Sequence, residues 1–213
     1  LAMRKEAAAL GLDLNEVTVY LLNAQDQLFQ GESVKAGQKL NQILSECGVK
    51  VLHNRKAVRE EAGMTLLDNG GALPAGLCIW TIGLVPNPAL RSMGLPLTPE
   101  GQIRVDECYR VQGAPGVYSI GDCANIVDPA TGKADQMTCK EGSFQAMRLA
   151  KIIAADLKGR PAPVHKPVMN YFCIGLGPDR GLIWARKWGL EITLTGKLAW
   201  KIKQWTWDLA SVL

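Results

Sequence analysis

The amino-acid sequence predicts an α/β fold with a parallel sheet, and three observations indicate it. Residues 16–22 and 49–52 are apolar and rich in β-branched side chains, which is typical of buried strands. Residues 35–47 between them repeat apolar side chains at helical spacing, so strand, helix and strand alternate as in parallel sheets. Residues 116–122 contain another apolar run that stops at a Gly-Asp pair, the pattern of a buried strand that delivers a carboxylate to a sheet edge.

The first half of the chain continues with further short elements. A helix is expected over residues 1–10, and the helix over 35–47 buries one face before Gly48, a residue suited to the position after a helix end. The apolar residues of that face are Leu40, Ile43 and Leu44. The remaining predicted strands are residues 57–61, 64–67 and 77–80.

The Gly-Asp pair is a candidate binding site. Gly121 lets the backbone approach a ligand closely because it lacks a side chain. The carboxylate of Asp122 accepts hydrogen bonds from hydroxyl groups. Because a Gly-Asp pair also occurs in plain turns, its interpretation depends on the motifs around it.

The clearest helix is predicted over residues 138–158. Thr138 and Glu141 match the capping box S/T-x-x-E, in which the hydroxyl caps the helix and the carboxylate reciprocates. Apolar residues repeat at helical spacing and are expected to form the buried face. They are Phe144, Met147, Ala150, Ile153, Ala154 and Leu157. The proline-rich residues 161–167 then mark the expected boundary to a small C-terminal region.

The C-terminal segment combines basic charge with tryptophan. Residues 154–213 hold nine Lys/Arg against four Asp/Glu, and five of the six tryptophans lie in the last thirty residues. A helical wheel of residues 197–213 shows an apolar stripe that we expect to dock on the protein. The stripe consists of Leu198, Ile202, Trp205, Leu209 and Val212. Trp200 and Trp207 share the opposite side with lysines, which favours contact with a membrane surface.

The composition excludes several classes of protein and site. With 213 residues, 47% hydrophobic and 21% charged, the chain is globular, and its apolar runs are shorter than the about 20 residues that span a bilayer. The net charge of +4 is modest, and no nucleic-acid partner is expected. The six cysteines form no CxxC pair, and His53 and His165 are the only histidines, so neither a redox dithiol nor a metal site is expected. We interpret the cysteines as reduced thiols of an intracellular protein.

Three motifs in order carry a family resemblance. They are the run LCIWTIGLVPNP at 77–88, GLPL followed by GQIRVD within 94–106, and PGVYSIGD at 115–122. In this order they resemble the flavoproteins of the pyridine nucleotide–disulfide reductase superfamily, which contain two dinucleotide-binding domains. The resemblance implies a fragment of that fold, because no G-x-G-x-x-G occurs anywhere in the chain. The 213 residues by themselves are then expected neither to retain FAD nor to turn over NADH.

The resemblance also implies domain boundaries. Residues 1–86 are the second half of an NAD(P)-binding domain, and Gly83 marks the exit from it. Residues 87–160 are the C-terminal segment of an FAD-binding domain, and residues 161–213 form a small membrane-association region. Within the superfamily, the chain is most similar to type II NADH dehydrogenases and to flavoproteins resembling apoptosis-inducing factor 2, on its Lys-Pro linker and its LTGKLAW segment at 194–200.

The same resemblance assigns roles to the residues around the flavin. Gly121 and Asp122 lie on its ribityl chain and pyrophosphate. The helix that begins near residue 138 points at the pyrimidine edge of the flavin, which places Thr138 and Cys139 against the cofactor. Two further residues, Gln136 and Lys140, are the catalytic candidates. A lysine at this edge adds positive charge, which favours the reduced flavin anion.

The nicotinamide nucleotide is expected at the end of the strand over 16–22. In dinucleotide-binding domains this strand usually ends in an acidic residue that binds the ribose. Here Asn23 takes that place, and no arginine close to it in the sequence indicates a 2′-phosphate, so NADH is favoured over NADPH.

The function implied is electron transfer from NAD(P)H through FAD to a quinone at a membrane surface. Such an enzyme is expected to be cytoplasmic and peripheral on the inner face of the cell membrane, or on the corresponding organelle membrane, and homodimer formation stays open. Residues 135–140 share only Gln136 with the family segment Ala-Gln-x-Ala-x-Gln. A second kind of electron acceptor is therefore kept as an alternative to the quinone. That alternative is a soluble reductase of a small ferredoxin-like protein. A third is an inactive fragment that acts as an interaction module.

Overall fold

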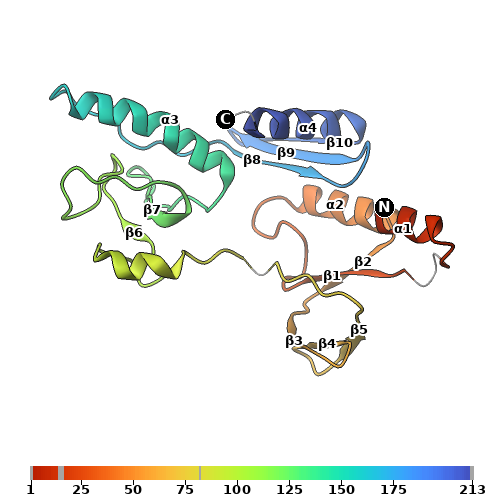
Figure 1. The fold of residues 1–213 in the computed structure, drawn as a ribbon. Helices are drawn as coiled ribbons and strands as arrows, with labels where there is room; N and C mark the ends of the chain where they lie inside the picture. The colour runs from red at the N-terminus through yellow and green to blue at the C-terminus, as the bar shows by residue number, and fades with distance from the viewer. Residues whose placement is uncertain (1, 14–16, 82, 212–213) are drawn as a thin grey trace. The chain divides into compact units, whose positions relative to one another are not determined.

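The chain forms two compact units, shown in the computed structural model of Figure 1, which describes residues 2–13, 17–81 and 83–211. The first unit comprises Leu1–Trp80 and Met169–Leu213, and the second comprises Thr81–Val168. The domain boundaries expected from the sequence stay a prediction. The C-terminal segment, which we expected as a region of its own, is grouped here with the first eighty residues.

A parallel strand pair and its connecting helix open the first unit, after helix α1 (Ala2–Ala9). Strand β1 (Val19–Asn23) pairs in parallel with β2 (Val49–His53), and α2 (Val34–Glu46) connects them. The N-cap of α2 is Ser33, whose hydroxyl accepts a hydrogen bond from the Ala36 amide at 3.2 Å. The predicted alternation of strand and helix is confirmed.

An antiparallel meander follows. It consists of β3 (Ala57–Glu61), β4 (Met64–Leu67) and β5 (Ala72–Pro74), in that order across the sheet. The strand expected at residues 77–80 is wrong. Residues 77–80 pair with no strand in the described chain, and the side chains of Leu77 and Ile79 are 72% and 75% exposed. An apolar run needs neighbouring strands to satisfy its backbone groups, and these are not supplied here.

A second sheet in the first unit is built from the C-terminal segment. The strands β8 (Asn170–Gly175), β9 (Gly181–Lys187) and β10 (Leu190–Thr195) are antiparallel, with β9 in the middle. One face buries Leu182 and Trp184 against helix α2. Helix α4 (Lys197–Ser211) packs against the same three strands. It lies on the opposite face of the sheet from α2, where Gly181 of β9 contacts it.

The orientation of α4 corrects the sequence expectation. Ala199 is fully buried, and Trp200 lies so close to the sheet that a Cβ atom added at Gly175 would be 2.7 Å from its ring. By contrast, Leu198 and Trp205 are 58% and 64% exposed, and Ile202 is exposed as well. The apolar stripe therefore points away from the protein; its expected members Leu209 and Val212 lie outside the described side chains. Only small or flat side chains fit where the helix meets these glycines, which explains the reversal.

The second unit is mostly loops around a short parallel pair, β6 (Ile103–Arg104) and β7 (Ala124–Asn125). It also contains the 3₁₀ helices η1 (Pro88–Met93) and η2 (Gly121–Cys123) and one long helix, α3 (Cys139–Asp156). Its largest core surrounds Tyr109 and Ile152, which are fully buried. No helix in the described part of the chain is both long and apolar enough to cross a bilayer.

The predicted strand before the Gly-Asp pair is wrong as a regular strand. Tyr118 forms an isolated antiparallel bridge with Arg110, and the Ser119 amide donates to the carbonyl of Tyr109 at 3.0 Å. Tight turns at Gly113 and Gly116 precede the run, and η2 follows it at once, so the pairing stays local.

The packing of α3 also corrects an expectation. The apolar residues predicted as its buried face are all exposed, including Phe144 at 45%, Met147 at 56% and Leu157 at 82%. The side chains that face the unit are instead Glu141, Gln145 and Ile152. The reason is local chemistry, because the surrounding backbone amides and carboxylates need polar partners from the helix.

Candidate functional site

The Gly-Asp pair lies at a tight turn with an exposed carboxylate. Gly121 has φ of +69°, in the left-handed region that favours glycine, and its amide donates to Oε1 of Gln145 at 2.7 Å. Asp122 is exposed, and its carboxylate takes part in no hydrogen bond or ion pair among the described residues. This carboxylate is therefore available to accept hydrogen bonds from hydroxyl groups of a ligand.

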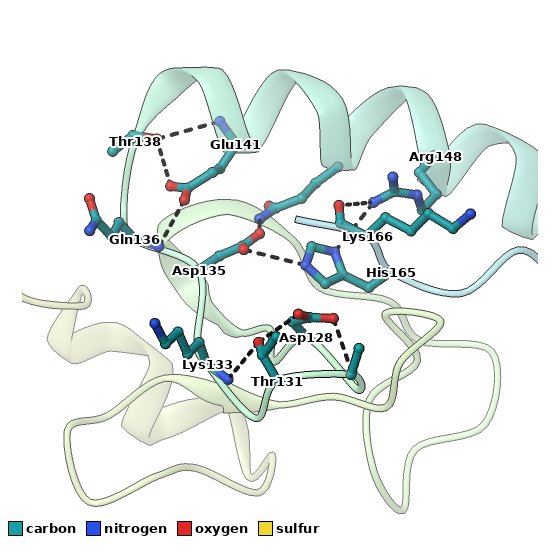
Figure 2. Close-up of polar contacts among 12 residues, drawn as sticks. Asp128, Thr131, Lys133, Asp135, Gln136, Thr138, Glu141, Arg148, His165 and Lys166 are labelled. Atoms are coloured by element: carbon teal, nitrogen blue, oxygen red, sulfur yellow. Dashed lines mark hydrogen bonds and ion pairs between the residues drawn. The ribbon is translucent and has the colours of Figure 1, made fainter. Parts of the chain in front are cut away.

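The capping box at the start of α3 is confirmed, with a change in its partners (Figure 2). The hydroxyl of Thr138 accepts from the Glu141 amide at 3.4 Å and donates to Oε2 of Glu141 at 2.6 Å. The other carboxylate oxygen accepts from the Gln136 amide at 3.1 Å. Glu141 therefore orders the segment before the helix as well as its first turn.

One side chain ties the Gly-Asp turn to this segment. Gln145 accepts from the Gly121 amide with Oε1 and donates with Nε2 to Oδ2 of Asp135 at 2.9 Å. It is only 3% exposed. The turn and the residues that lead into α3 are therefore held in one hydrogen-bonded arrangement.

The predicted residues at the helix start lie close together in the chain and in the fold. Gln136 and Cys139 are exposed, whereas Thr138 and Lys140 are half-buried. Their proposed roles toward a flavin stay predictions. The helix amino terminus carries partial positive charge, so this surface suits carbonyl or anionic groups of a ligand.

A buried polar cluster beside this surface was not predicted (Figure 2). The hydroxyl of Tyr109 lies 2.9 Å from Nδ1 of His165 and accepts from the Arg148 guanidinium at 2.8 Å. On the other side of the imidazole, Nε2 lies 3.3 Å from Oδ1 of Asp135. Because Asp135 also binds Gln145, the cluster continues to the Gly-Asp turn.

The hydrogen-bond donors around His165 indicate its tautomer. A guanidinium can only donate, and Nη1 of Arg148 lies 3.3 Å from Nδ1 of the imidazole as well as near the Tyr109 hydroxyl. We therefore assign Nδ1 as an acceptor and place the ring proton on Nε2, which lies 3.3 Å from Oδ1 of Asp135 but forms no hydrogen bond among the described residues. Burial raises the pKa of Tyr109, and the hydrogen bond from Arg148 opposes the rise. No spacing motif signals this cluster, since its members are brought together by tertiary contacts.

A second polar cluster holds the far end of α3. Arg110 donates to both carboxylate oxygens of Asp156, at 2.9 Å and 2.6 Å, and the Tyr118 hydroxyl donates to the same carboxylate at 2.6 Å. The hydrogen bonds from Arg110 and then from Tyr118 lower the pKa of Asp156 to about 2. The residues just before the Gly-Asp turn are thereby anchored to the last turn of the helix.

The remaining predicted site residues are Asn23 and Gly83, which lie in different units. Asn23 ends β1; its Nδ2 donates to the Gln25 carbonyl at 3.0 Å and lies 3.0 Å from Nδ1 of His53. The fold corrects the expectation about arginine, because the Arg55 amide donates to the Asn23 carbonyl at 3.1 Å. An arginine therefore follows directly at the edge where the ribose was expected. Gly83 is exposed, with φ of +109°.

Comparison with known proteins places these observations in context. Residues 5–148 match the family described as pyridine nucleotide-disulphide oxidoreductase. The chain is 32% identical over 204 residues to the internal alternative NAD(P)H-ubiquinone oxidoreductase A1, mitochondrial, of Arabidopsis thaliana, which covers 88% of this chain and 39% of that protein. It is 33% identical over 128 residues to the demethylphylloquinone reductase NdbB of Synechocystis sp., covering 60% of this chain and 30% of that protein.

Solved structures show the same fold. The sulfide:quinone oxidoreductase from Aquifex aeolicus superposes with a TM-score of 0.74 over 95% of this chain and 51% of that chain, at 16% identity. At this identity the likeness concerns the fold alone. The chain spans less than half the length of the two curated relatives named above.

Proposed function

Because the chain belongs to the pyridine nucleotide-disulphide oxidoreductase family, we propose that it is the C-terminal part of an FAD-dependent enzyme that passes electrons from NAD(P)H to a quinone. The observation that supports this most is the tie between the Gly-Asp turn and the start of α3 through Gln145. The two relatives compared above carry NAD(P)H-ubiquinone oxidoreductase and demethylphylloquinone reductase in their names, which favours a quinone as acceptor.

The residues of the second unit fit the flavin that this proposal requires. The exposed carboxylate of Asp122 would accept hydrogen bonds from the ribityl or ribose hydroxyls, and Gly121 leaves open space where a Cβ would stand. Thr138, Cys139 and Lys140 at the start of α3 would face carbonyl groups of the ring. When bound, FAD supplies the redox chemistry between NAD(P)H and the acceptor. Gln145 and Glu141 hold the two parts of this surface in place.

In the first unit, the edge at the end of β1 would hold the ribose of the nicotinamide nucleotide. Asn23 offers no negative charge there, and Arg55 follows at the end of the neighbouring strand. A neutral side chain with an arginine nearby accommodates a 2′-phosphate better than an acidic residue does. We therefore keep both NADH and NADPH as substrates.

Membrane association through α4 is part of the proposal, with a face that differs from the sequence expectation. The outward stripe of Leu198, Ile202 and Trp205, flanked by the exposed Lys201, would lie on the lipid headgroups. The proposed location of the enzyme is the cytoplasmic face of the cell membrane or the corresponding organelle membrane. A soluble reductase of a ferredoxin-like acceptor stays the second candidate, and it would lose activity with salt rather than with detergent.

The proposal is tested by flavin retention in the full-length protein. Replacing Asp122 with Asn removes the negative charge but keeps the size of the side chain. We expect FAD affinity to fall at least tenfold, because a hydrogen bond to a charged group contributes roughly 1.5–3 kcal/mol. Asp26→Asn, an exposed aspartate of the first unit, is the matched control. Equal FAD affinity of the wild type and both variants would show that Asp122 does not bind the flavin.

A further inference from the structure

The strand β10 carries its apolar side chains on the outside. Leu190 and Ile192 are 71% and 69% exposed. Glu191 between them lies on the other face of the strand, where its carboxylate accepts from the Ser33 hydroxyl at 2.8 Å and from Nε of Arg186 at 3.1 Å. The apolar side of this strand is therefore exposed, whereas that of an ordinary surface strand faces the core.

These apolar side chains lie on the side of the sheet that α4 covers. Leu190 pairs with Lys187 and Ile192 with Ala185, positions that alternate with the Leu182 and Trp184 side facing α2. The helix covers this side at Gly175 and Gly181, which pair with each other at the opposite end of the strands. The end of the sheet at the β9–β10 turn is left open, and Trp188 in that turn is 88% exposed.

The charges at this end are basic. The ammonium of Lys187 lies 4.3 Å from the centre of the Trp188 ring. Lys203 of α4, which packs near Gly175 at the opposite end of the strands, lies 5.5 Å from the ring of Trp207, which is 64% exposed. The turn residues 187–190 include no acidic residue, and the carboxylate of Glu191 is paired on the other face. Lysine beside exposed tryptophan and aliphatic side chains matches the chemistry of an anionic lipid interface.

We propose that the end of the β9–β10 hairpin is a second lipid-contact surface, separate from the helix stripe. Trp188, Leu190 and Ile192 enter the interface of an anionic bilayer, and Lys187 meets the headgroup phosphates. This inference rests on the proposed membrane association of the protein. The additional contact is independent of α4, because Trp188 lies in the turn between β9 and β10.

The test is vesicle co-sedimentation of the full-length protein. The probe is phosphatidylcholine vesicles with and without one part in about four of phosphatidylglycerol, a fraction that gives an anionic surface. The hairpin variant combines Trp188→Ser, Leu190→Thr and Ile192→Thr, which keep β propensity on the strand. We expect its partition onto anionic vesicles to fall about tenfold, and that of Trp188→Ser alone to fall about threefold.

The matched control replaces three other exposed apolar side chains of the same unit, Leu10→Ser, Val58→Thr and Leu77→Ser, which are 73%, 61% and 72% exposed. Partition of this control is expected to equal that of the wild type. Far-ultraviolet circular dichroism and thermal unfolding check that the variants fold. If the triple variant of the hairpin unfolds, the vesicle binding of Trp188→Ser alone decides whether the hairpin contacts lipid.

The outcomes separate this inference from the proposed function. If the helix variant Leu198→Ser, Ile202→Ser and Trp205→Ser releases the protein but the hairpin variant does not, the hairpin surface is wrong and membrane association stands. If the wild type binds no vesicles, both are wrong. A hairpin variant that changes the oligomeric mass but not vesicle binding would show a contact between copies of the chain, and would also overturn the inference.

Discussion

Replacing Gln145 with Leu tests whether the Gly-Asp turn and the start of α3 are held together as one arrangement. The leucine has a similar size, but it removes the acceptor of the Gly121 amide and the donor to Asp135, bonds of 2.7 Å and 2.9 Å. Leaving a buried polar group without its partner costs about 1–3 kcal/mol, and more when the group is charged. The side chain of Asp135 is only 9% exposed, whereas the Gly121 amide is partly open to water. We therefore expect a loss of about 2–4 kcal/mol in the free energy of unfolding of the second unit.

The measurement is urea denaturation, with Gln112→Leu as the control. Gln112 is exposed, and its amide lies 3.5 Å from the nearest carbonyl acceptor, so its replacement is expected to change stability by less than about 0.5 kcal/mol. The Gln145 variant should also retain less FAD in the full-length protein, because the turn is no longer fixed. Equal unfolding free energies for the two variants would refute the reasoning, since the network would then contribute nothing measurable.

Two further predictions concern charge. The pKa of Asp156 is lowered to about 2 from an ordinary value near 3.8, so the stability it contributes is present above about pH 4 and is lost as the pH falls toward 2. Arg110→Gln should make the decrease in stability at acidic pH smaller, because the pKa of Asp156 is then lowered less. Acid unfolding followed by circular dichroism measures this, and an unchanged unfolding curve would contradict the assignment. Arg55→Gln should lower the kcat/KM for NADPH more than that for NADH in the full-length protein, since the backbone contact with Asn23 brings Arg55 to the proposed ribose edge. Steady-state kinetics with both nucleotides decide this, and an equal decrease for both would count against it.

Local patterns were sufficient where the element depends on its own residues. The strands β1 and β2 and the helix α2 follow from β-branched runs and apolar periodicity, and the cap at Thr138 follows from the S/T-x-x-E spacing. Each of these features needs only side chains that are near one another in the sequence. The family was likewise predicted, because the motifs that carry it are short and ordered along the chain.

Two strand predictions failed for lack of pairing partners, and the errors in the helices concern which side of the helix faces the protein. Periodicity identifies an apolar stripe but not the neighbour that covers it, so the stripes of α3 and α4 were both assigned inward although both lie outside. The inward positions are chosen by long-range partners, such as Gly121 for Gln145 and Gly175 for Trp200. The His165 cluster was missed for the same reason, because Tyr109 lies 56 residues away in the sequence.

The facing glycines of β8 and β9 have a mechanical consequence. Gly175 and Gly181 form one rung of the sheet, and an added Cβ at either would meet α4 at 2.7 Å. The absence of a side chain at both positions therefore determines how closely the helix packs against the strands. A single methyl group at this rung would lift the near end of α4 and tilt its outward residues relative to the hairpin. The two glycines thus determine the angle between α4 and the β9–β10 hairpin, and with it whether the exposed tryptophans and lysines of both can contact one surface at the same time.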